Sequence, residues 1–292
     1  MKILVTGKDG QLGKSIHKIV DRVNVSNNKP IHEFVFVGRN ELDFGDKEAI
    51  ENFLSDNNFD VIINCAAYTA VDKAESQKFL ANQINNLAVK QIAQLVSNTK
   101  TKLIHISTDY VFDGESDAPY VETDKTNPIN VYGCTKLAGE QSIQNTMPNN
   151  AIIIRTSWVY SEYGNNFVNT MLNLGSKREE VGVISDQIGS PTYASDLAKA
   201  ILVIVDSQSF VEKSLATQVY HYSNKGKCSW YEFAQEIFDL TNIKCSIKPI
   251  ISEEYLSQAE RPKNTLMNQD KILKEFDLNT PPWKESLARC IG

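Results

Sequence analysis

The amino-acid sequence predicts an α/β fold, in which a Rossmann-like, doubly wound parallel sheet is followed by a smaller C-terminal substrate-binding lobe. Short apolar runs rich in β-branched residues alternate with helix-like segments through the first half of the chain. These runs lack polar alternation, which is typical of parallel strands buried on both faces. A glycine-rich turn directly follows the first run, where a doubly wound fold has its ligand crevice. After about residue 160 the alternation becomes irregular.

Residues 1–160 are predicted to form an NAD(P)-binding Rossmann domain. Its expected strands are residues 2–7, 32–38, 61–67, 102–108 and 151–160. The expected helices are residues 11–23, 46–57, 76–97 and a segment that begins at Val131. In the first helix, apolar residues recur at a spacing of three or four, as at Leu12, Ile16 and Ile19, so one face is buried on the sheet.

Residues 161–292 are predicted to form mostly the substrate-binding lobe, with segments that return to the Rossmann core. A helix at 195–206 is expected to return, with Ser195 or Asp196 available as its cap. Residues 219–223 are expected to form a strand and residues 229–240 a capped amphipathic helix. Residues 244–268 are expected to be irregular.

Composition makes several classes of protein poor candidates. The chain has 292 residues, a net charge of -6 and no basic tract of five or more residues, so nucleic acid and anionic membranes are poor partners. Its five cysteines include no C-x-x-C pair, which favours reduced thiols over a disulfide framework or a zinc site. No apolar run approaches the roughly 18 residues that span a bilayer, and the first run is too short for a signal peptide. We expect a cytoplasmic protein.

The turn after the first strand has the chemistry of a phosphate site. Gly7, Gly10 and Gly13 form a G-x-x-G-x-x-G pattern at the mouth of a helix. Glycines let backbone N–H groups approach a pyrophosphate, and the helix N-terminus adds a partial positive charge. Arg39 follows the second strand, where an acidic residue would bind ribose hydroxyls, so a 2′-phosphate and NADPH are favoured, with NADH possible. The alternatives are a turn without a ligand and a solvated arginine.

Polar groups at the end of the fourth strand and in the following helix predict a reduction site. Thr108 lies at the strand end, and Tyr132 and Lys136 are one helical turn apart. A tyrosine is a poor acid unless its pKa is perturbed, and a nearby ammonium is expected to lower that pKa. The same ammonium suits the nicotinamide ribose, and Thr108 suits a carbonyl oxygen that gains negative charge. Alternatively, the strand-end hydroxyls of Ser107 and Thr108 bond local backbone.

Several longer motifs carry a family resemblance. They are "GKDGQLG", "AAYTAVDKAE", "STDYVFDG", "NVYGCTKLAGE", "RTSWVY", "GNNFVNTML" and "DQIGSPT". With them the chain resembles the extended short-chain dehydrogenase/reductases, and within these the dTDP-4-dehydrorhamnose reductase family. The resemblance implies reduction of the 4-keto group of dTDP-4-dehydro-β-L-rhamnose to dTDP-β-L-rhamnose by NAD(P)H, the final step of dTDP-L-rhamnose biosynthesis.

The resemblance also implies roles for individual residues. The catalytic residues fall on Thr108, Tyr132 and Lys136. Cofactor contacts fall on Gly10, Gln11, Leu12, Asp43, Phe44, Ala67, Tyr68 and Thr69. Substrate contacts fall on Thr108, Asp109 and Trp158, although Trp158 in plain core packing is an alternative. Arg261, in "RPKN", is a separate candidate because a planar, bidentate donor suits the substrate diphosphate; the alternative is a surface arginine.

The chain departs from the family at two places. Some members have an acidic residue after the second strand, where this chain has Gly38 and Arg39, which leaves the choice of cofactor open. Some members dimerise around Mg²⁺ through glutamates, and these positions fall on Ser15 and near Ser195. Mg²⁺ is therefore uncertain, no metal ligands are assigned, and a homodimer is possible.

Two other functions remain open from the sequence. One is a reductase or epimerase of a related nucleotide-deoxysugar, which needs the same glycine turn, tyrosine and lysine. The other is a non-catalytic, NADP-binding regulatory subunit, as in proteins of this type that serve methionine adenosyltransferase. The complete set of Thr108, Tyr132 and Lys136 argues against a pure binding protein.

Overall fold

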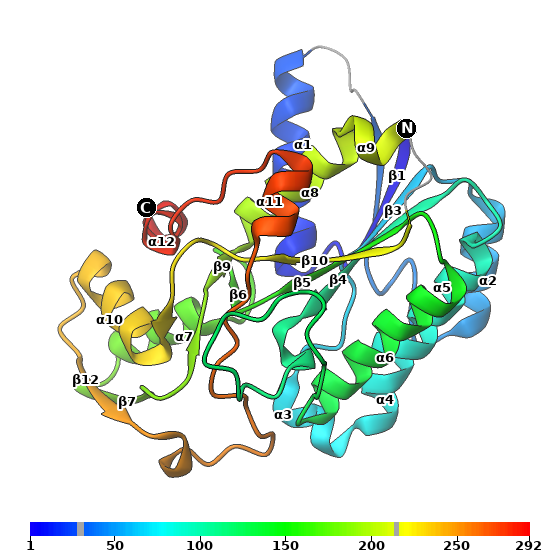
Figure 1. Ribbon diagram of the computed structural model, residues 1–292. Helices are drawn as coiled ribbons and strands as arrows, with labels where there is room; N and C mark the ends of the chain where they lie inside the picture. The colour runs from blue at the N-terminus through cyan, green and yellow to red at the C-terminus, as the bar shows by residue number, and fades with distance from the viewer. Residues whose placement is uncertain (28–31, 213–215) are drawn as a thin grey trace.

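A six-stranded parallel sheet forms the centre of the molecule (Figure 1). The computed structural model describes residues 1–27, 32–212 and 216–292. The strand order is β10-β5-β4-β3-β1-β2, so the order reverses between β1 and β3. The strands are β1 (Lys2–Thr6), β2 (Glu33–Val37), β3 (Val61–Asn64), β4 (Lys102–Thr108), β5 (Ala151–Thr156) and β10 (Gln218–Tyr222). This sheet confirms the predicted fold class and the positions of the six predicted strands.

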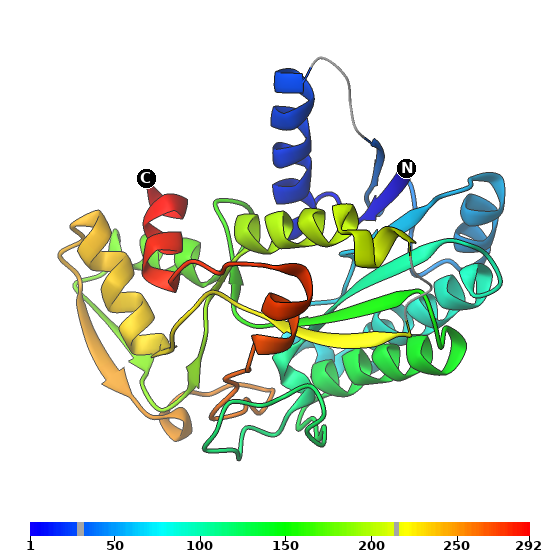
Figure 2. The ribbon, with the colours of Figure 1, turned by 45° about the horizontal axis from the view of Figure 1, so that its top comes forward.

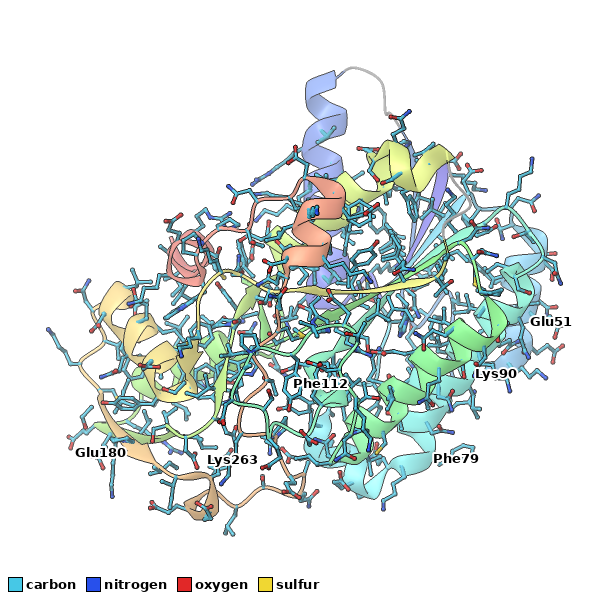
Figure 3. All side chains as sticks on the ribbon, in the orientation of Figure 1. Glu51, Phe79, Lys90, Phe112, Glu180 and Lys263 are labelled. Atoms are coloured by element: carbon cyan, nitrogen blue, oxygen red, sulfur yellow. The ribbon has the colours of Figure 1, made fainter. Side chains whose placement is uncertain are left out.

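Helices cover both faces of the sheet and bury its apolar side chains. One face packs against α1 (Gln11–Asn27), α8 (Ala194–Asp206), α9 (Gln208–Glu212) and α11 (Asp270–Phe276). The other face packs against α2 (Lys47–Asp56), α5 (Ala88–Val96) and α6 (Val131–Thr146). In Figure 3, Phe112 lies deep in the interior, whereas Phe79 and Lys90 project outward from the second helical layer. Each sheet face is thus a separate apolar core.

A smaller lobe with its own core lies beside the sheet (Figures 1 and 2). It contains the helices α7 (Phe167–Gly175), α10 (Trp230–Thr241) and α12 (Trp283–Ile291) and the pair β7 (Glu180–Ile184) and β12 (Ser246–Ile250). Two short pairs join β6 (Val159–Tyr160) to β9 (Thr192–Tyr193), and β8 (Ile188–Gly189) to β11 (Cys228–Ser229). Ser229 and Glu232 form a capping box that starts α10, which confirms the capped helix expected there.

The structure corrects four expectations about single elements. The helix expected at 76–97 is divided into α4 (Lys78–Asn82), a π-helical turn at Gln83–Leu87, and α5, and it is preceded by α3 (Val71–Ser76). The π turn directs the buried Asn85 side chain to the backbone of Tyr68. The Asn85 amide accepts from the Tyr68 N–H and donates to the Tyr68 carbonyl. The strand expected at 151–160 breaks at Trp158, whose φ of 48° is incompatible with a strand.

The third and fourth corrections concern residues 194–206 and 244–268. Neither Ser195 nor Asp196 caps α8, because the helix begins after Tyr193 without a side-chain cap. Buried Asp196 instead accepts hydrogen bonds from Asn224, Ser286 and Arg289. The region expected to be irregular contains β12 and a short 3₁₀ turn at Ser252–Glu254. None of the helices that the structure describes has the length and apolar character that crossing a membrane needs.

Candidate active site

A cavity of about 1180 Å³ opens at the carboxyl ends of the sheet strands and extends to the smaller lobe. The volume exceeds the range of about 300–1,000 Å³ that is usual for one drug-sized ligand, so it leaves room for two. The cavity lining includes every residue that was predicted to be catalytic or to bind cofactor or substrate: Gly7, Gly10, Gln11, Leu12, Gly13, Arg39, Asp43, Phe44, Ala67, Tyr68, Thr69, Thr108, Asp109, Tyr132, Lys136, Trp158 and Arg261. The fold thus brings these residues together from both parts of the chain.

The glycine turn after β1 presents bare backbone to this cavity. Gly7 has a φ of 70°, and a side chain there would lie 2.8 Å from the backbone nitrogen of Ala66. A side chain on Gly13 would collide with the carbonyl of Gly7. The turn closes through a bond from Gly10 N to Gly7 O of 2.9 Å, and α1 begins at the next residue. The close backbone packing and the helix N-terminus fit a dinucleotide pyrophosphate.

Charges of both signs surround the end of β2. Arg39 is largely exposed, and its Nε lies 3.2 Å from Asp43 Oδ2. Glu41 accepts from the backbone of Gly38 and pairs with Lys8 at 2.5 Å. The Asp9 carboxylate fills the space that a side chain at residue 38 would need, so the glycine there lets Asp9 reach the cavity. Asp9 and Glu41 were not predicted as site residues, because their proximity to Arg39 depends on folding.

Thr108, Tyr132 and Lys136 converge from β4 and α6. Asn130 caps α6 by accepting from Gly133 N at 2.8 Å, so Tyr132 lies in the first helical turn. Buried Thr108 donates to Asp109 Oδ1 at 2.9 Å. Buried Lys136 donates to Ile106 O at 2.6 Å and contacts His105 Nε2 at 3.2 Å.

The pKa values correct the expectation that Lys136 lowers the pKa of Tyr132. Burial raises the pKa of Tyr132 to about 12; the Thr108 hydroxyl opposes this rise, and the Asp109 carboxylate adds to it. Lys136 does not lower the tyrosine pKa because its amine is directed to β4. Burial lowers the pKa of Lys136 itself to about 8, against the opposing effects of Glu140 and Cys65. The phenol is therefore protonated at neutral pH, which is the state that a proton donor needs.

Asp109 is a second perturbed acid beside the cavity. Burial raises the pKa of Asp109 to about 6, although the hydroxyls of Thr265 and Thr108 favour its ionised form. Thr265 lies in the C-terminal segment, so the environment of this strand-end carboxylate includes groups from β4 and from the C-terminal part of the chain. Perturbed acids in a cleft are typical of functional sites.

An aromatic pair forms the wall of the cavity on the side of the smaller lobe. Trp158 stacks on Trp230 with ring centroids 3.5 Å apart and planes 8° apart. A side chain on Gly189 would lie 2.6 Å from the Trp158 ring, so only glycine leaves room for this indole. Both rings are half-buried and also pack against the core of the lobe. Trp230 was not predicted as a site residue, although its position at the start of α10 was visible in the sequence.

Arg261 joins the C-terminal segment to α3 at the wall of the cavity. Its Nη2 donates to Asp72 Oδ2 at 2.7 Å, and its Nη1 donates to Ala259 O at 3.1 Å. The Arg261 side chain is only 19% exposed, so the alternative of a surface arginine is wrong. A guanidinium on the cavity wall is placed to meet an anionic ligand.

The positions at which family glutamates were expected have other surroundings. Buried Ser15 donates to Gln11 O within α1, and Ser195 lies in the first turn of α8. Across residues 1–27, 32–212 and 216–292, no group of three or more His, Cys, Asp or Glu side chains is placed to hold a metal ion.

The whole chain matches one family. Residues 1–292 match the model described as the RmlD substrate binding domain. The chain belongs to this family. The dTDP-4-dehydrorhamnose reductase of Salmonella typhimurium is 37% identical, over 100% of this chain and 97% of the relative. The Streptomyces niveus protein named dTDP-4-keto-6-deoxy-D-glucose reductase is 34% identical, over 91% of this chain and 88% of the relative.

Crystal structures of family members have the same fold. The dTDP-4-dehydrorhamnose reductase of Clostridium acetobutylicum has a TM-score of 0.90 and 40% identity, with 100% of this chain and 98% of that chain covered. The Bacillus anthracis reductase, in complex with NADP, has a TM-score of 0.90 and 37% identity, with 99% of this chain and 98% of that chain covered.

Proposed function

We propose that the protein is a dTDP-4-dehydrorhamnose reductase. It reduces the 4-keto group of dTDP-4-dehydro-β-L-rhamnose with NADPH, which gives dTDP-β-L-rhamnose and completes dTDP-L-rhamnose biosynthesis. The observation that carries this proposal is one cavity that joins the glycine turn to Thr108, Tyr132 and Lys136 in a chain that matches such reductases over its full length.

The reduction needs a hydride on carbon and a proton on oxygen. Bound NADPH supplies the hydride for C4 of the sugar. Tyr132 donates its phenolic proton to the C4 oxygen, and its raised pKa supports a protonated phenol before the reaction. Thr108 donates a hydrogen bond to the same oxygen as negative charge develops there. Lys136 holds the nicotinamide ribose. To do so, its amine has to turn away from Ile106 O on β4 and towards the cavity.

The arginine after β2 is the proposed selector of NADPH. We expect Arg39→Ala to weaken NADPH binding by roughly five- to tenfold, because an exposed guanidinium–phosphate contact contributes modestly in water. The Kd for NADH should stay within about twofold, since NADH has no 2′-phosphate. Fluorescence titrations with both cofactors check this, with Arg178→Ala as a control at an exposed arginine outside the cavity. Equal weakening for both cofactors contradicts the assignment.

The guanidinium of Arg261 is the proposed contact for the substrate diphosphate. We expect Arg261→Gln to raise the KM for the nucleotide sugar about tenfold or more, because a charge-assisted, bidentate contact is lost. The Kd for NADPH should not change. The matched variant Asp72→Asn removes the ion-pair partner of Arg261 and should not raise this KM. Steady-state kinetics check both variants, and an unchanged KM in Arg261→Gln excludes the contact.

A second candidate is a 4-keto reductase of another deoxysugar, which the Streptomyces niveus relative favours. The test is a comparison of kcat/KM for dTDP-4-dehydro-β-L-rhamnose and dTDP-4-keto-6-deoxy-D-glucose at saturating NADPH, with the products identified by NMR. A clear preference for the first sugar and a dTDP-β-L-rhamnose product support the proposal. A preference for the second sugar moves the function to the alternative.

We also propose that the enzyme works in the cytoplasm, which the five free cysteines support. A homodimer stays a prediction from the resemblance.

A further inference from the structure

Four buried polar side chains form a row beneath the cavity, from β1 to α6. The strand register puts Thr6 opposite Asn64 and Asn64 opposite His105. Thr6 Oγ1 donates to Asn64 Oδ1 at 2.7 Å, Asn64 Nδ2 lies 3.0 Å from His105 Nδ1, and His105 Nε2 lies 3.2 Å from Lys136 Nζ. None of the four residues is more than 1% exposed. The partners of each group are therefore other groups of the protein.

A backbone amide sets the direction of these hydrogen bonds. The N–H of Ala66 donates to Asn64 Oδ1 at 3.2 Å and to Thr6 Oγ1 at 3.3 Å, and a backbone N–H cannot become an acceptor. Asn64 Oδ1 therefore faces Ala66 and Thr6, and its Nδ2 faces His105. Because Nδ2 only donates, His105 Nδ1 has to accept.

The tautomer of His105 follows from this direction. Burial keeps the pKa of His105 well below its ordinary value, so the ring is neutral. A neutral imidazole whose Nδ1 accepts carries its proton on Nε2, and that N–H is directed at Lys136 Nζ. An ammonium has no lone pair, so it would face this N–H as a second donor. A neutral amine accepts from His105 and still donates to Ile106 O.

We propose that the row Thr6–Asn64–His105 holds Lys136 as a neutral amine while its side chain lies against β4. His105 is the positioning residue, because its N–H stabilises only the neutral amine at this position. The charged form of Lys136 therefore has to move away from β4. Below the titration midpoint, the ammonium loses its contact with His105 and is released towards the cavity that Tyr132 lines. The part of Lys136 in the reaction rests on the proposed function, whereas its protonation state against β4 does not.

Two other ionisable groups near Lys136, Cys65 and Glu140, act against burial and favour its charged form. Cys65 follows β3, and burial raises the pKa of its thiol to about 12, so it carries no charge at neutral pH. The Glu140 carboxylate, one turn along α6, raises the pKa of Lys136, but its bonds to the Arg155 guanidinium, from Nε at 3.0 Å and Nη2 at 2.7 Å, offset part of its charge. His105 on β4 is the ionisable side chain that directly contacts Lys136 Nζ.

The test is a pair of NMR titrations on the full chain without added cofactor. The ¹³Cε resonance of Lys136, assigned with Lys136→Arg, gives its titration midpoint, and ¹⁵N-labelled imidazole gives the tautomer of His105. We expect the Nε2–H tautomer at pH 9.5 and a Lys136 midpoint near 8. An Nδ1–H tautomer at pH 9.5, or a midpoint near the ordinary lysine value of about 10.4, overturns the proposal.

A variant pair separates the two possible directions of the His105–Lys136 bond. If His105 donates, His105→Met removes a stabiliser of the neutral amine, and the Lys136 midpoint rises by about half a pH unit to one unit. If His105 accepts, the same variant lowers the midpoint and the proposal is wrong. His221→Met is the matched control, since His221 is equally buried but lies on β10, beyond β5, and should leave the midpoint unchanged.

His105→Gln serves if the methionine variant does not fold, because an amide oxygen can accept from the ammonium and should also raise the midpoint. A midpoint that stays or falls in this variant contradicts the proposal. These titrations do not depend on catalysis. They therefore test the protonation state of Lys136 even if the protein lacks the proposed reductase activity.

Discussion

The Tyr132→Phe variant is expected to bind NADPH like the wild type and to lose turnover by roughly 10²- to 10⁴-fold, the range typical of a general acid. The substitution removes only the phenolic oxygen, which carries the proton for the ketone. The ring keeps its edge-on packing against Tyr110, with centroids 5.8 Å apart. NADPH oxidation in the presence of the nucleotide sugar measures the loss of turnover, and a fluorescence titration measures binding.

The matched control is Tyr231→Phe, which removes the same atom from a tyrosine on α10 outside the cavity. Its turnover should equal that of the wild type. Wild-type turnover in Tyr132→Phe, or an equal loss of NADPH affinity, contradicts the role of Tyr132 as proton donor.

The Glu140→Leu variant is expected to lose about 3–5 kcal/mol of unfolding free energy, because it leaves a buried guanidinium without its partner. Glu140 and Arg155 are 1% and 5% exposed. Ser107 on β4 also donates to Glu140 at 2.5 Å, so this carboxylate ties α6 to β4 and β5. Equilibrium unfolding in urea measures the change, provided that the m-values of variant and wild type agree.

The double variant Glu140→Leu/Arg155→Met is the control for this prediction. It removes both charges, so it should recover most of the lost stability. A single variant within about 1 kcal/mol of the wild type would show that the pair does not anchor α6. A double variant that is as unstable as the single one would assign the loss to packing rather than to the unpaired charge.

The central fold and the cavity lining were predictable because their signals are local in the sequence. β1, the glycine turn and α1 are consecutive in the chain. The strands β3 and β4 are each recognisable from one uninterrupted apolar run. Parallel strands bring their carboxyl ends to one edge, so Thr108 and the start of α6 had to lie near the glycine turn. The positions of the predicted site residues therefore followed from strand order.

The features that were not predictable depend on contacts between distant residues. Asp196 could cap α8, but it bonds side chains 28 to 93 positions later in the chain. Trp158 breaks its strand because its ring lies over Gly189 and against Trp230. The direction of the Lys136 amine depends on Ile106 O and His105, on a strand 30 residues earlier. Helical spacing showed that Tyr132 and Lys136 are neighbours, but the orientation of each side chain required the folded structure.

The most direct test of the proposed reduction uses NADPH carrying deuterium at the transferred position of the nicotinamide, with dTDP-4-dehydro-β-L-rhamnose as substrate. We expect one NADPH to be oxidised for each sugar reduced, with deuterium at C4 of the dTDP-β-L-rhamnose product. NADPH that binds but is not oxidised, or a sugar that changes configuration without net oxidation of the cofactor, would contradict the proposed reductase.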